Sequence, residues 1–198
     1  MSLKQALAAA AAAALVCAAA GGASAATLIG AKTIHITNHL NDYLQVAEVV
    51  ANSSGVDVAA SSNGGSASGE ADWQSAHGGV STAPSNAIDG NTDGIYVDGS
   101  IYHSVDGNGF LDITLAAPSD LSSLLIYGRT DCCKARDVYD VTVFNGGGTQ
   151  IYSRTLDATS SSPVNAVPEP ATWALMMLGV VGVGATLRSR RKLALAAA

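Results

Sequence analysis

Apolar and polar residues alternate over short stretches in the middle of the chain, and this period of two predicts β-strands. In FLDITL (110–115) the two leucines and the isoleucine fall on one face of the predicted strand, and the other three side chains fall on the opposite face. Six further runs alternate in the same way or are rich in β-branched residues: KTIHITNH (32–39), DYLQVAEVVA (42–51), VDVAA (56–60), LSSLLIYG (121–128), YDVTVFN (139–145) and TQIYSRTL (149–156). Clusters of Gly, Asn, Asp and Ser separate the runs, as turns do.

These runs predict an all-β domain, an antiparallel β-sandwich or jelly roll with functional loops at one end. No stretch of this region keeps a helical period of 3.6, although residues 42–51 could form a helix by propensity alone. The segment SSNGGSASGEADWQSAHGG (61–79) is predicted as a long loop. Long ordered loops on a rigid sandwich usually bind something, so we expect this loop to contribute to function.

The first 25 residues have the order of a secretory signal peptide. Lys4 is followed by an apolar run from Ala6 to about Ala20, and a stretch of small residues ends at Ala25. This order predicts export, with cleavage after Ala25. An alanine-rich helix of the mature fold is the alternative.

The C-terminal stretch VPEPATWALMMLGVVGVGATLRSRRK (167–192) combines a Pro-Glu-Pro turn, an apolar segment and a basic cluster. The apolar segment, residues 171–187, is at the short end of the range for a membrane span, and the basic cluster should stay cytoplasmic. This order resembles the PEP-CTERM sorting tail, in which residues 167–170 would be recognised by an exosortase. The resemblance implies a Gram-negative bacterium that makes exopolysaccharide, and a protein delivered to the cell surface or the extracellular matrix. A plain C-terminal membrane anchor is the alternative.

The expected layout is a signal peptide (1–25), one β-sandwich domain (26–160), a linker with the Pro-Glu-Pro motif (161–170), a transmembrane sorting helix (171–187) and a basic cytoplasmic tail (188–198). About 140 residues lie between the two signals, enough for one domain. From Ala26 to Val167 the chain carries five Lys or Arg and fifteen Asp or Glu, a net charge of −10. Such a charge repels nucleic acid and anionic lipid, so neutral sugars and divalent cations are the expected partners.

Four segments of the domain follow one another in an order typical of one family. They are NAIDGN (86–91), GSIYHS (99–104), GFLDITL (109–115) and LLIYGRTDCCKAR (124–136). Their order and approximate spacing resemble the F-type lectins, or fucolectins, which are discoidin-like, galactose-binding-like β-sandwiches. The most specific element is the pattern Arg-x-Asp-Cys-Cys-x-x-Arg at 129–136. The resemblance implies a fucose-binding protein.

The resemblance assigns three hydrogen-bond donors to the sugar, His103, Arg129 and Arg136, with Asp131 in its motif position. These residue types suit a sugar because arginine is a planar fork of donors that stays charged, and histidine adds a further donor. Asp131 would hold the two forks in place and offset their repulsion. The segment between His103 and Arg129 is one residue shorter than the family pattern, and we place the missing residue in the loop SVDGNGF (104–110). A surface cluster of salt bridges is the alternative for an isolated Arg-x-Asp pattern.

Of the three cysteines, Cys17 lies within the predicted signal peptide, which leaves Cys132 and Cys133 for an oxidising compartment. Neighbouring Cα atoms are about 3.8 Å apart, below the usual range for a disulfide, so a bridge here would close a small strained ring. The resemblance implies this vicinal disulfide, packed against the sugar as a rigid apolar plate. A pair of free thiols for metal binding or redox exchange is the alternative.

The methyl group of fucose also needs an apolar wall. Trp73 and His77 in the long loop, and Tyr96 in DGIYVDG (93–99), could supply it. Trp73 is by residue type more often a core residue than a sugar platform, but its polar and glycine-rich flanks indicate a loop.

The resemblance further implies a structural calcium ion held by oxygen atoms, as a hard cation requires. The expected ligands are Asn86, Asp89, Asn91, Ser100 and Glu48. Glu48 enters this set because the chain after Arg154 leaves no strand for the usual final position. We therefore expect residues 43–51 to fill that position in a circularly permuted arrangement. The alternative for the Asp-Gly-Asn sequence at 89–91 is an ordinary turn without metal.

No pair of carboxylates, Ser-His combination or phosphate loop stands at a spacing that demands catalysis. We therefore expect a non-enzymatic, exported carbohydrate-binding protein of fucose type, with fucosylated glycans or exopolysaccharide as partners. Two alternatives stay open. One is a structural matrix or biofilm protein that keeps the sandwich but binds no free sugar. The other is a redox-responsive or metal-responsive surface protein that uses the cysteine pair.

Overall fold

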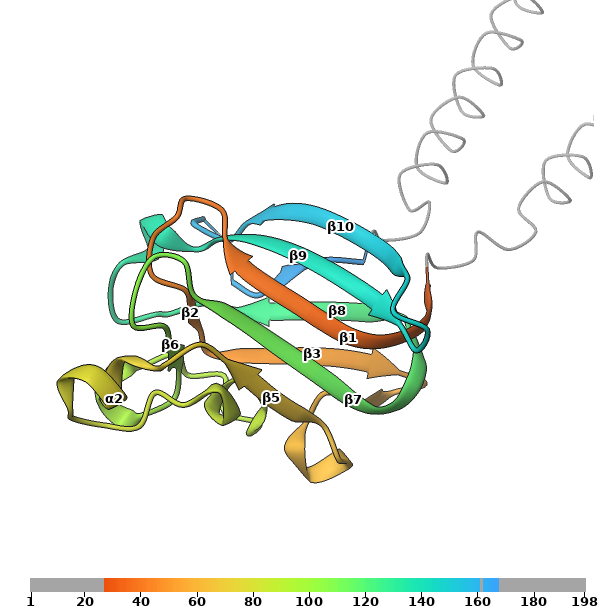
Figure 1. Ribbon diagram of the computed structural model, residues 1–198, viewed down its shortest axis with the longest axis horizontal. Helices are drawn as coiled ribbons and strands as arrows, with labels where there is room; N and C mark the ends of the chain where they lie inside the picture. Colours follow the sequence, from red (N-terminus) through yellow and green to blue (C-terminus); the bar gives the residue numbers. More distant parts are fainter. Residues whose placement is uncertain (1–26, 161, 168–198) are drawn as a thin grey trace, which may run out of the picture. The chain divides into compact units, whose positions relative to one another are not determined.

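The computed structural model of the chain describes residues 27–160 and 162–167 (Figure 1). The predicted signal peptide, the sorting helix at 171–187, the basic tail at 188–198 and part of the linker lie outside the described residues. In the two described ranges no helix is long and apolar enough to cross a membrane. What is described is mostly β-structure, with antiparallel sheets in a sandwich-like arrangement, as the alternation of apolar and polar residues predicts.

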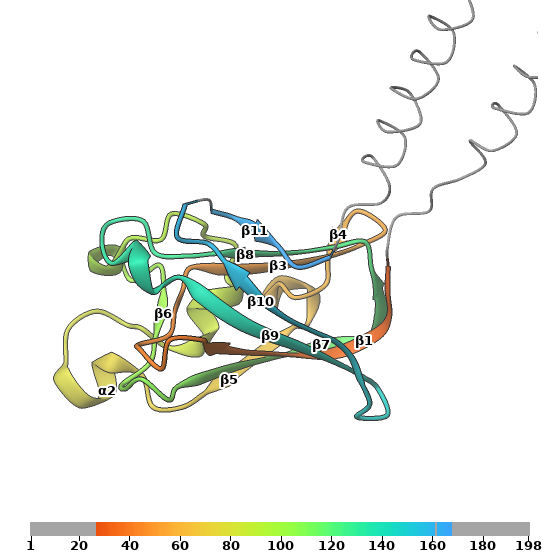
Figure 2. The same ribbon diagram turned by 90° about the horizontal axis from the view of Figure 1, so that it is seen from above.

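Two sheets form the layers of the sandwich (Figure 2). The five-stranded sheet has, in spatial order, the strands β10 (Gln150–Asp157), β9 (Val138–Asn145), β1 (Leu28–Asn38), β7 (Phe110–Leu121) and β5 (Ser66–Gly69). The four-stranded sheet has the order β11 (Val164–Asn165), β8 (Ser123–Tyr127), β3 (Glu48–Ser53) and β4 (Val56–Asp57). A small pair of strands, β2 (Gln45–Val46) and β6 (Tyr102–His103), completes the described sheets. One short α-helix and four 3₁₀ turns occur in the described loops: α2 (Trp73–His77), η1 (Ser61–Asn63), η2 (Pro84–Ile88), η3 (Tyr96–Asp98) and η4 (Lys134–Arg136).

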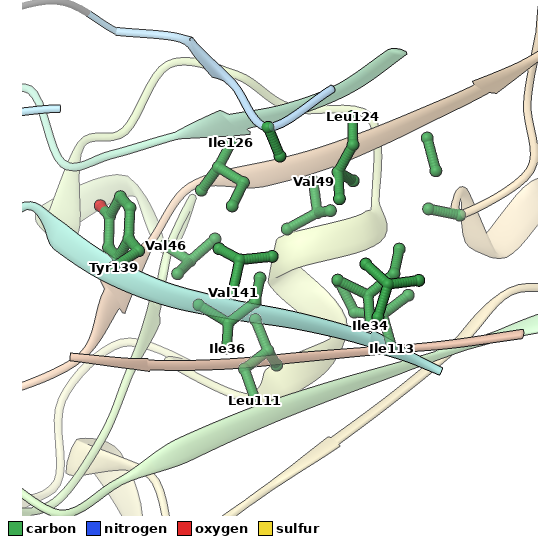
Figure 3. Packing of buried hydrophobic residues seen from close by; sticks show 14 of the residues in the cluster. Ile34, Ile36, Val46, Val49, Leu111, Ile113, Leu124, Ile126, Tyr139 and Val141 are labelled. Atoms are coloured by element: carbon green, nitrogen blue, oxygen red, sulfur yellow. The ribbon is translucent and has the colours of Figure 1, made fainter. Parts of the chain in front are cut away.

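The core lies between the two large sheets and follows the alternation of the sequence. Leu111, Ile113 and Leu115 of β7 are buried, whereas Asp112 and Thr114 are only partly buried on the other face. Figure 3 shows how side chains of the two layers meet: Ile34, Ile36, Leu111, Ile113 and Val141 from one sheet, and Val49, Leu124 and Ile126 from the other. Burial of these aliphatic side chains, at about 25 cal/mol per Å² of apolar surface, is the main stabilising contribution.

Residues 42–51, which could have formed a helix by propensity, form β-structure instead. The run is divided at Ala47 into β2, which pairs with β6, and β3, which pairs with β8. The register places Gln45 opposite His103 and Glu48 opposite Tyr127. Tertiary pairing therefore overrides the local helical tendency of this segment.

Two of our expectations from the sequence are wrong in detail. The predicted long loop 61–79 contains β5, which pairs with β7, as well as the short helix α2. The chain after Arg154 is not free of strands, because the two-residue β11 pairs with β8 near the end of the described domain. Both strands are short and have no apolar alternation of their own, so only their pairing partners make them strands.

The ends of the described domain lie close together at one end of the sandwich. Leu28 pairs with Leu121, and the Ala166 amide donates to the Leu124 carbonyl, so both chain ends lie near the β7–β8 turn. The loop 128–137 leaves the opposite end of β8, and α2 and β6 lie at that end as well (Figure 1). The predicted site residues are thus gathered mainly at the end of the sandwich far from its termini.

Candidate functional site

The loop 128–137 connects β8 to β9 and carries the Arg-x-Asp-Cys-Cys-x-x-Arg pattern. Arg129 donates through Nε to Asp131 Oδ1 at 2.5 Å and through Nη2 to Oδ2 at 3.3 Å. The hydrogen bonds from Arg129 hold the pKa of Asp131 below its ordinary value, so the carboxylate is ionised and the pair is fork to fork. The amide of Tyr96 also donates to Asp131, which ties the loop to η3.

Arg136, at the other end of the pattern, is held by a different segment. Its Nε lies 3.3 Å from Asp42 Oδ2, and its carbonyl oxygen accepts a 2.6 Å hydrogen bond from Asn38 Nδ2. Each guanidinium therefore has one carboxylate partner and keeps further N–H donors, because arginine carries five. Asp131 pairs with Arg129 and not with both arginines.

Cys132 and Cys133 are joined by a disulfide between adjacent residues. Cys133 has a positive φ of 63° and precedes η4, which returns the chain toward β9. Both cysteines are half-buried, so the disulfide reaches the surface of the loop between the two arginines. A disulfide in this position offers an apolar surface with no side-chain freedom to lose on binding.

His103 is on β6 and is only 5% exposed. Its Nδ1 is 2.7 Å from the Ser104 carbonyl oxygen, and its Nε2 is 2.8 Å from Gln45 Nε2. Burial lowers the pKa of His103, and the charges of Arg129 and Arg136 lower it further. The neutral ring therefore donates from Nδ1 to Ser104 and accepts at Nε2 from Gln45, so a sugar hydroxyl would have to replace Gln45 to bond with it.

An aromatic cluster surrounds His103. Tyr43, Trp73 and Tyr96 have ring centroids 5.3, 5.1 and 6.2 Å from the imidazole. Trp73 in turn stacks on His77 at 3.8 Å with an interplanar angle of 13°. The cluster has the apolar faces and polar edges that sugar rings contact in proteins.

The two arginines lie over rings of the same cluster. The Cζ of Arg129 is 5.0 Å from the centroid of Tyr96, and the Cζ of Arg136 is 5.3 Å from that of Tyr43. These cation–π contacts add to the carboxylate pairs in fixing the guanidinium planes. The structure thus brings together Arg129, Asp131, the disulfide, Arg136, His103 and Tyr96, together with Trp73 and His77.

Asp42, Tyr43 and Gln45 also belong to this cluster, and we did not predict them from the sequence. The pairing of β2 with β6 places Gln45 opposite His103, and the pairing of β1 with β9 brings Asp42 and Tyr43 to Arg136; in both cases the strands are more than fifty residues apart in the chain. No local pattern identifies such a contact. The pairing itself would have to be known first.

The residues expected to bind calcium lie in and after η2 and on β3. Glu48 is fully buried; its Oε2 accepts a 3.2 Å hydrogen bond from the Gly90 amide, and its Oε1 has no hydrogen-bond partner among the described residues. Burial, with smaller contributions from the charges of Asp89 and Asp57, raises the pKa of Glu48 to about 8, although the hydrogen bond from the Gly90 amide opposes the rise. A buried carboxyl group with an unpaired oxygen, next to a second carboxylate, suits a divalent cation.

The other expected ligands hold the backbone around this position. Asn86 Nδ2 donates to the carbonyl oxygens of Ser81, Gly99 and Ile101. The Ser100 hydroxyl exchanges hydrogen bonds with the backbone of Ile95, and the Asn91 amide donates to Asp89 Oδ1. Their remaining oxygen atoms, main-chain carbonyls included, are those that a calcium ion could use.

In the described ranges no three His, Cys, Asp or Glu side chains gather into a metal-binding group. A calcium ion would therefore be held by at most two carboxylates, Glu48 and Asp89, and by amide and carbonyl oxygens. Calcium accepts such mixed oxygen shells, whereas zinc and other soft ions prefer His and Cys. The donor set fits calcium.

Comparison with known proteins supports the exported character of the chain. A family model described as the PEP-CTERM protein-sorting motif matches residues 166–192. No curated protein and no solved structure matches the chain. The chain carries a PEP-CTERM sorting motif and is an exported surface protein of Gram-negative type that is processed by an exosortase.

Proposed function

We propose that the β-sandwich is a non-enzymatic glycan-binding module of fucose type, presented at the cell surface or in the exopolysaccharide matrix. The observation that carries this proposal is the group formed by Arg129, Arg136 and the Cys132–Cys133 disulfide beside a cluster of aromatic rings. Guanidinium donors next to the apolar surfaces of a disulfide and aromatic rings suit a deoxy sugar, which has hydroxyl groups on one side and a methyl group on another.

The charge balance of the group favours a neutral ligand. Arg129 is paired with Asp131 and Arg136 with Asp42, so neither guanidinium is an uncompensated cation. An anionic sugar would meet these carboxylates and the strongly acidic domain around them. A neutral hydroxyl needs only the N–H groups that the carboxylates leave unused.

Burial of His103 affects its expected role. Because Gln45 already bonds to its Nε2, His103 is suited to fix the aromatic cluster as well as to meet the sugar. The side chain of Arg136 is 34% exposed and that of Arg129 is 12% exposed, against 5% for His103. We therefore assign the main recognition of hydroxyl groups to Arg129 and Arg136.

The proposal includes a structural calcium ion at Glu48 and Asp89. Such an ion would fix η2 and the segment 89–100. This segment contains η3, which carries Tyr96. Thr130 connects the segment to the arginine loop, since its amide donates to the Gly94 carbonyl oxygen at 2.8 Å. Calcium would therefore support the site without touching the sugar.

Titration calorimetry of residues 26–167 with L-fucose tests the proposal. A hydrogen bond from a charged donor contributes about 1.5–3 kcal/mol, so Arg129→Ala and Arg136→Ala should each weaken binding by about tenfold to a hundredfold. Arg154→Ala is the matched control, because Arg154 is exposed on β10. Circular dichroism and thermal unfolding should show that all three variants fold.

Absence of heat for L-fucose and for a panel of neutral glycans in the calcium-loaded wild type would refute the sugar proposal and favour the structural matrix protein. Loss of folding in both arginine variants would show instead that the arginines are structural.

A further inference from the structure

Asp137 is the first residue after the arginine loop, and its carboxyl group is buried without a partner. The residue is 1% exposed, and neither carboxyl oxygen meets the geometry of a hydrogen bond with any described residue, although the Tyr139 hydroxyl lies close enough to lower the pKa of the carboxyl group. The backbone, in contrast, is fully engaged: its amide donates to the Lys134 carbonyl, and its carbonyl accepts from the Ala158 amide. The main chain thus holds the carboxyl group beside the Tyr139 hydroxyl, and among the described residues it has no well-formed hydrogen bond.

The carboxyl group faces the opposite end of the same loop. A Cβ atom built on Gly128 would lie 2.3 Å from Asp137 Oδ2 and 2.8 Å from the Tyr139 hydroxyl oxygen. The absence of a side chain at Gly128 is therefore what makes room for the carboxyl group. Contact between residues 128 and 137 closes the loop that carries both arginines and the disulfide.

Tyr139 shows which protonation state fits this space. The Tyr139 hydroxyl donates its hydrogen to the Gln45 carbonyl oxygen at 2.9 Å. The hydroxyl oxygen can therefore offer only its lone pairs to Asp137. A protonated carboxyl group can donate to those lone pairs. An ionised carboxylate has no hydrogen to donate. It would either be repelled by these lone pairs or accept the hydroxyl hydrogen, which would break the hydrogen bond from Tyr139 to Gln45.

We propose that Asp137 is a positioning residue that carries a proton when the loop 128–137 is closed, and that its ionisation loosens the loop. This inference rests on the proposed sugar site, whose arginines lie one residue after Gly128 and one residue before Asp137. It extends that proposal, because binding becomes dependent on pH through a residue that does not touch the sugar.

The charged groups around Asp137 do not replace the proton. Arg129, on the loop after β8, is paired with Asp131, and Lys134 of η4 is exposed; the third neighbour, Tyr139 of β9, is fully buried. Burial raises the pKa of Asp137 to about 7, although these three groups oppose the rise. The low dielectric of the site disfavours an unpaired carboxylate more than the neighbouring charges favour it.

The direction of the pH effect follows from this difference. In an open loop the carboxyl group is solvated and has an ordinary pKa near 3.8, whereas in the closed loop it keeps its proton to about pH 7. The closed form therefore loses stability relative to the open form as pH rises from about 4 to 7, and loses no more above that. The closing equilibrium falls by at most about a thousandfold over this range.

Two measurements on residues 26–167 test the inference. Carboxyl NMR of ¹³C-labelled aspartate, without sugar, should show Asp137 titrating near pH 7, with the Asp137→Asn spectrum assigning the signal. L-Fucose affinity measured from pH 5 to 8.5 should fall in the wild type, by at most about a hundredfold, and stay at its pH 5 value in Asp137→Asn. Asp157→Asn, an exposed change on β10, should behave like the wild type.

The two proposals can fail separately. A carboxyl signal that titrates below about pH 5 overturns the inference, and so does an Asp137→Asn variant whose affinity falls with pH as in the wild type. If the wild type binds no L-fucose at any pH, the sugar site is refuted, while the NMR titration and amide exchange in residues 128–137 still decide whether the proton holds the loop. The wild-type signal can also be assigned by through-bond correlation of the Asp137 carboxyl carbon with its own backbone, so a failure of Asp137→Asn to fold leaves this test intact.

Discussion

Removal of the proposed calcium ion should make the stability of the domain depend on pH through Glu48. Without the ion, the buried Glu48 carboxyl group has a pKa of about 8, against 4.5 for the ordinary group. Because the folded pKa is raised, the folded state holds its proton more tightly than the unfolded state does. Stability is then greatest at low pH, falls as pH rises from about 4.5 to 8, and falls no further above 8.

The size of the effect follows from the pKa difference. Each unit corresponds to about 1.4 kcal/mol, so the loss from Glu48 amounts to at most about 5 kcal/mol. A domain of this size has a total stability of roughly 5–15 kcal/mol, so the loss is a large fraction of it. In a thermal scan it corresponds to a fall in Tm on the order of 10–20 °C.

The assay is thermal unfolding of chelator-treated protein at pH 5, 6, 7 and 8, followed by addition of calcium. Asp137 also has a raised pKa, so the comparison is made in the Asp137→Asn background with and without Glu48→Gln. Asp137→Asn alone should lose Tm with rising pH and regain it with calcium. The double variant should show neither response, because a neutral amide at position 48 needs no proton and offers no charge to the ion.

Two results would refute this reasoning. One is a flat Tm between pH 5 and 8 in the Glu48-containing protein, which would mean that the carboxyl group is solvated or paired. The other is an equal pH response with glutamine at position 48, which would place the titrating group elsewhere. A pH response that calcium does not reverse would support the buried proton on Glu48 and refute the calcium site.

Three further predictions concern the loop 128–137 and the side of the domain on which it lies. Gly128→Ala should destabilise the domain by about 1–3 kcal/mol in denaturant unfolding, because its Cβ would meet Asp137 and Tyr139 below 3.0 Å, whereas Gly147→Ala should have little effect, since its nearest neighbour would be 3.4 Å away. Reduction of Cys132–Cys133 should weaken fucose binding severalfold yet change the unfolding midpoint little, because the bridge closes almost no loop. A sensor surface that holds the protein by a tag after Val167 should preserve binding, whereas amine coupling through Lys134 should block it.

The sequence is most informative for strands that bury one face, because apolar and polar side chains alternate along them. β7 is the clear case, because Leu111, Ile113 and Leu115 must share one face for the strand to have a core side at all. β5 and β11 were missed for the opposite reason. Ser66–Gly69 has no large apolar side chain, so its strand geometry comes only from its hydrogen bonds to β7.

The site shows the same division between local and non-local information. Arg129, Asp131 and the cysteines lie within one loop, so their proximity could be expected from the sequence. The partners Asp42 and Tyr43 of Arg136 follow the end of β1, and the pairing of β1 with β9, together with the hydrogen bond from Asn38 to the Arg136 carbonyl, brings them there. The unpaired carboxyl group of Asp137 was not visible either, because in the sequence it is one more charged residue after Arg136.

The arrangement of the chain ends fits display at a surface. The sorting motif begins at residue 166, and the Ala166 amide is bonded to Leu124 at the start of β8. The arginine loop begins at residue 128, beyond the other end of the same strand. Five residues of extended chain separate these positions by roughly 17 Å, so the proposed site and the attachment of the sorting tail lie at opposite ends of β8. A domain held by its C-terminal side would therefore present the arginines, the disulfide and the aromatic cluster away from its point of attachment. Low affinity for a single sugar would be compensated by many copies held side by side on the same surface.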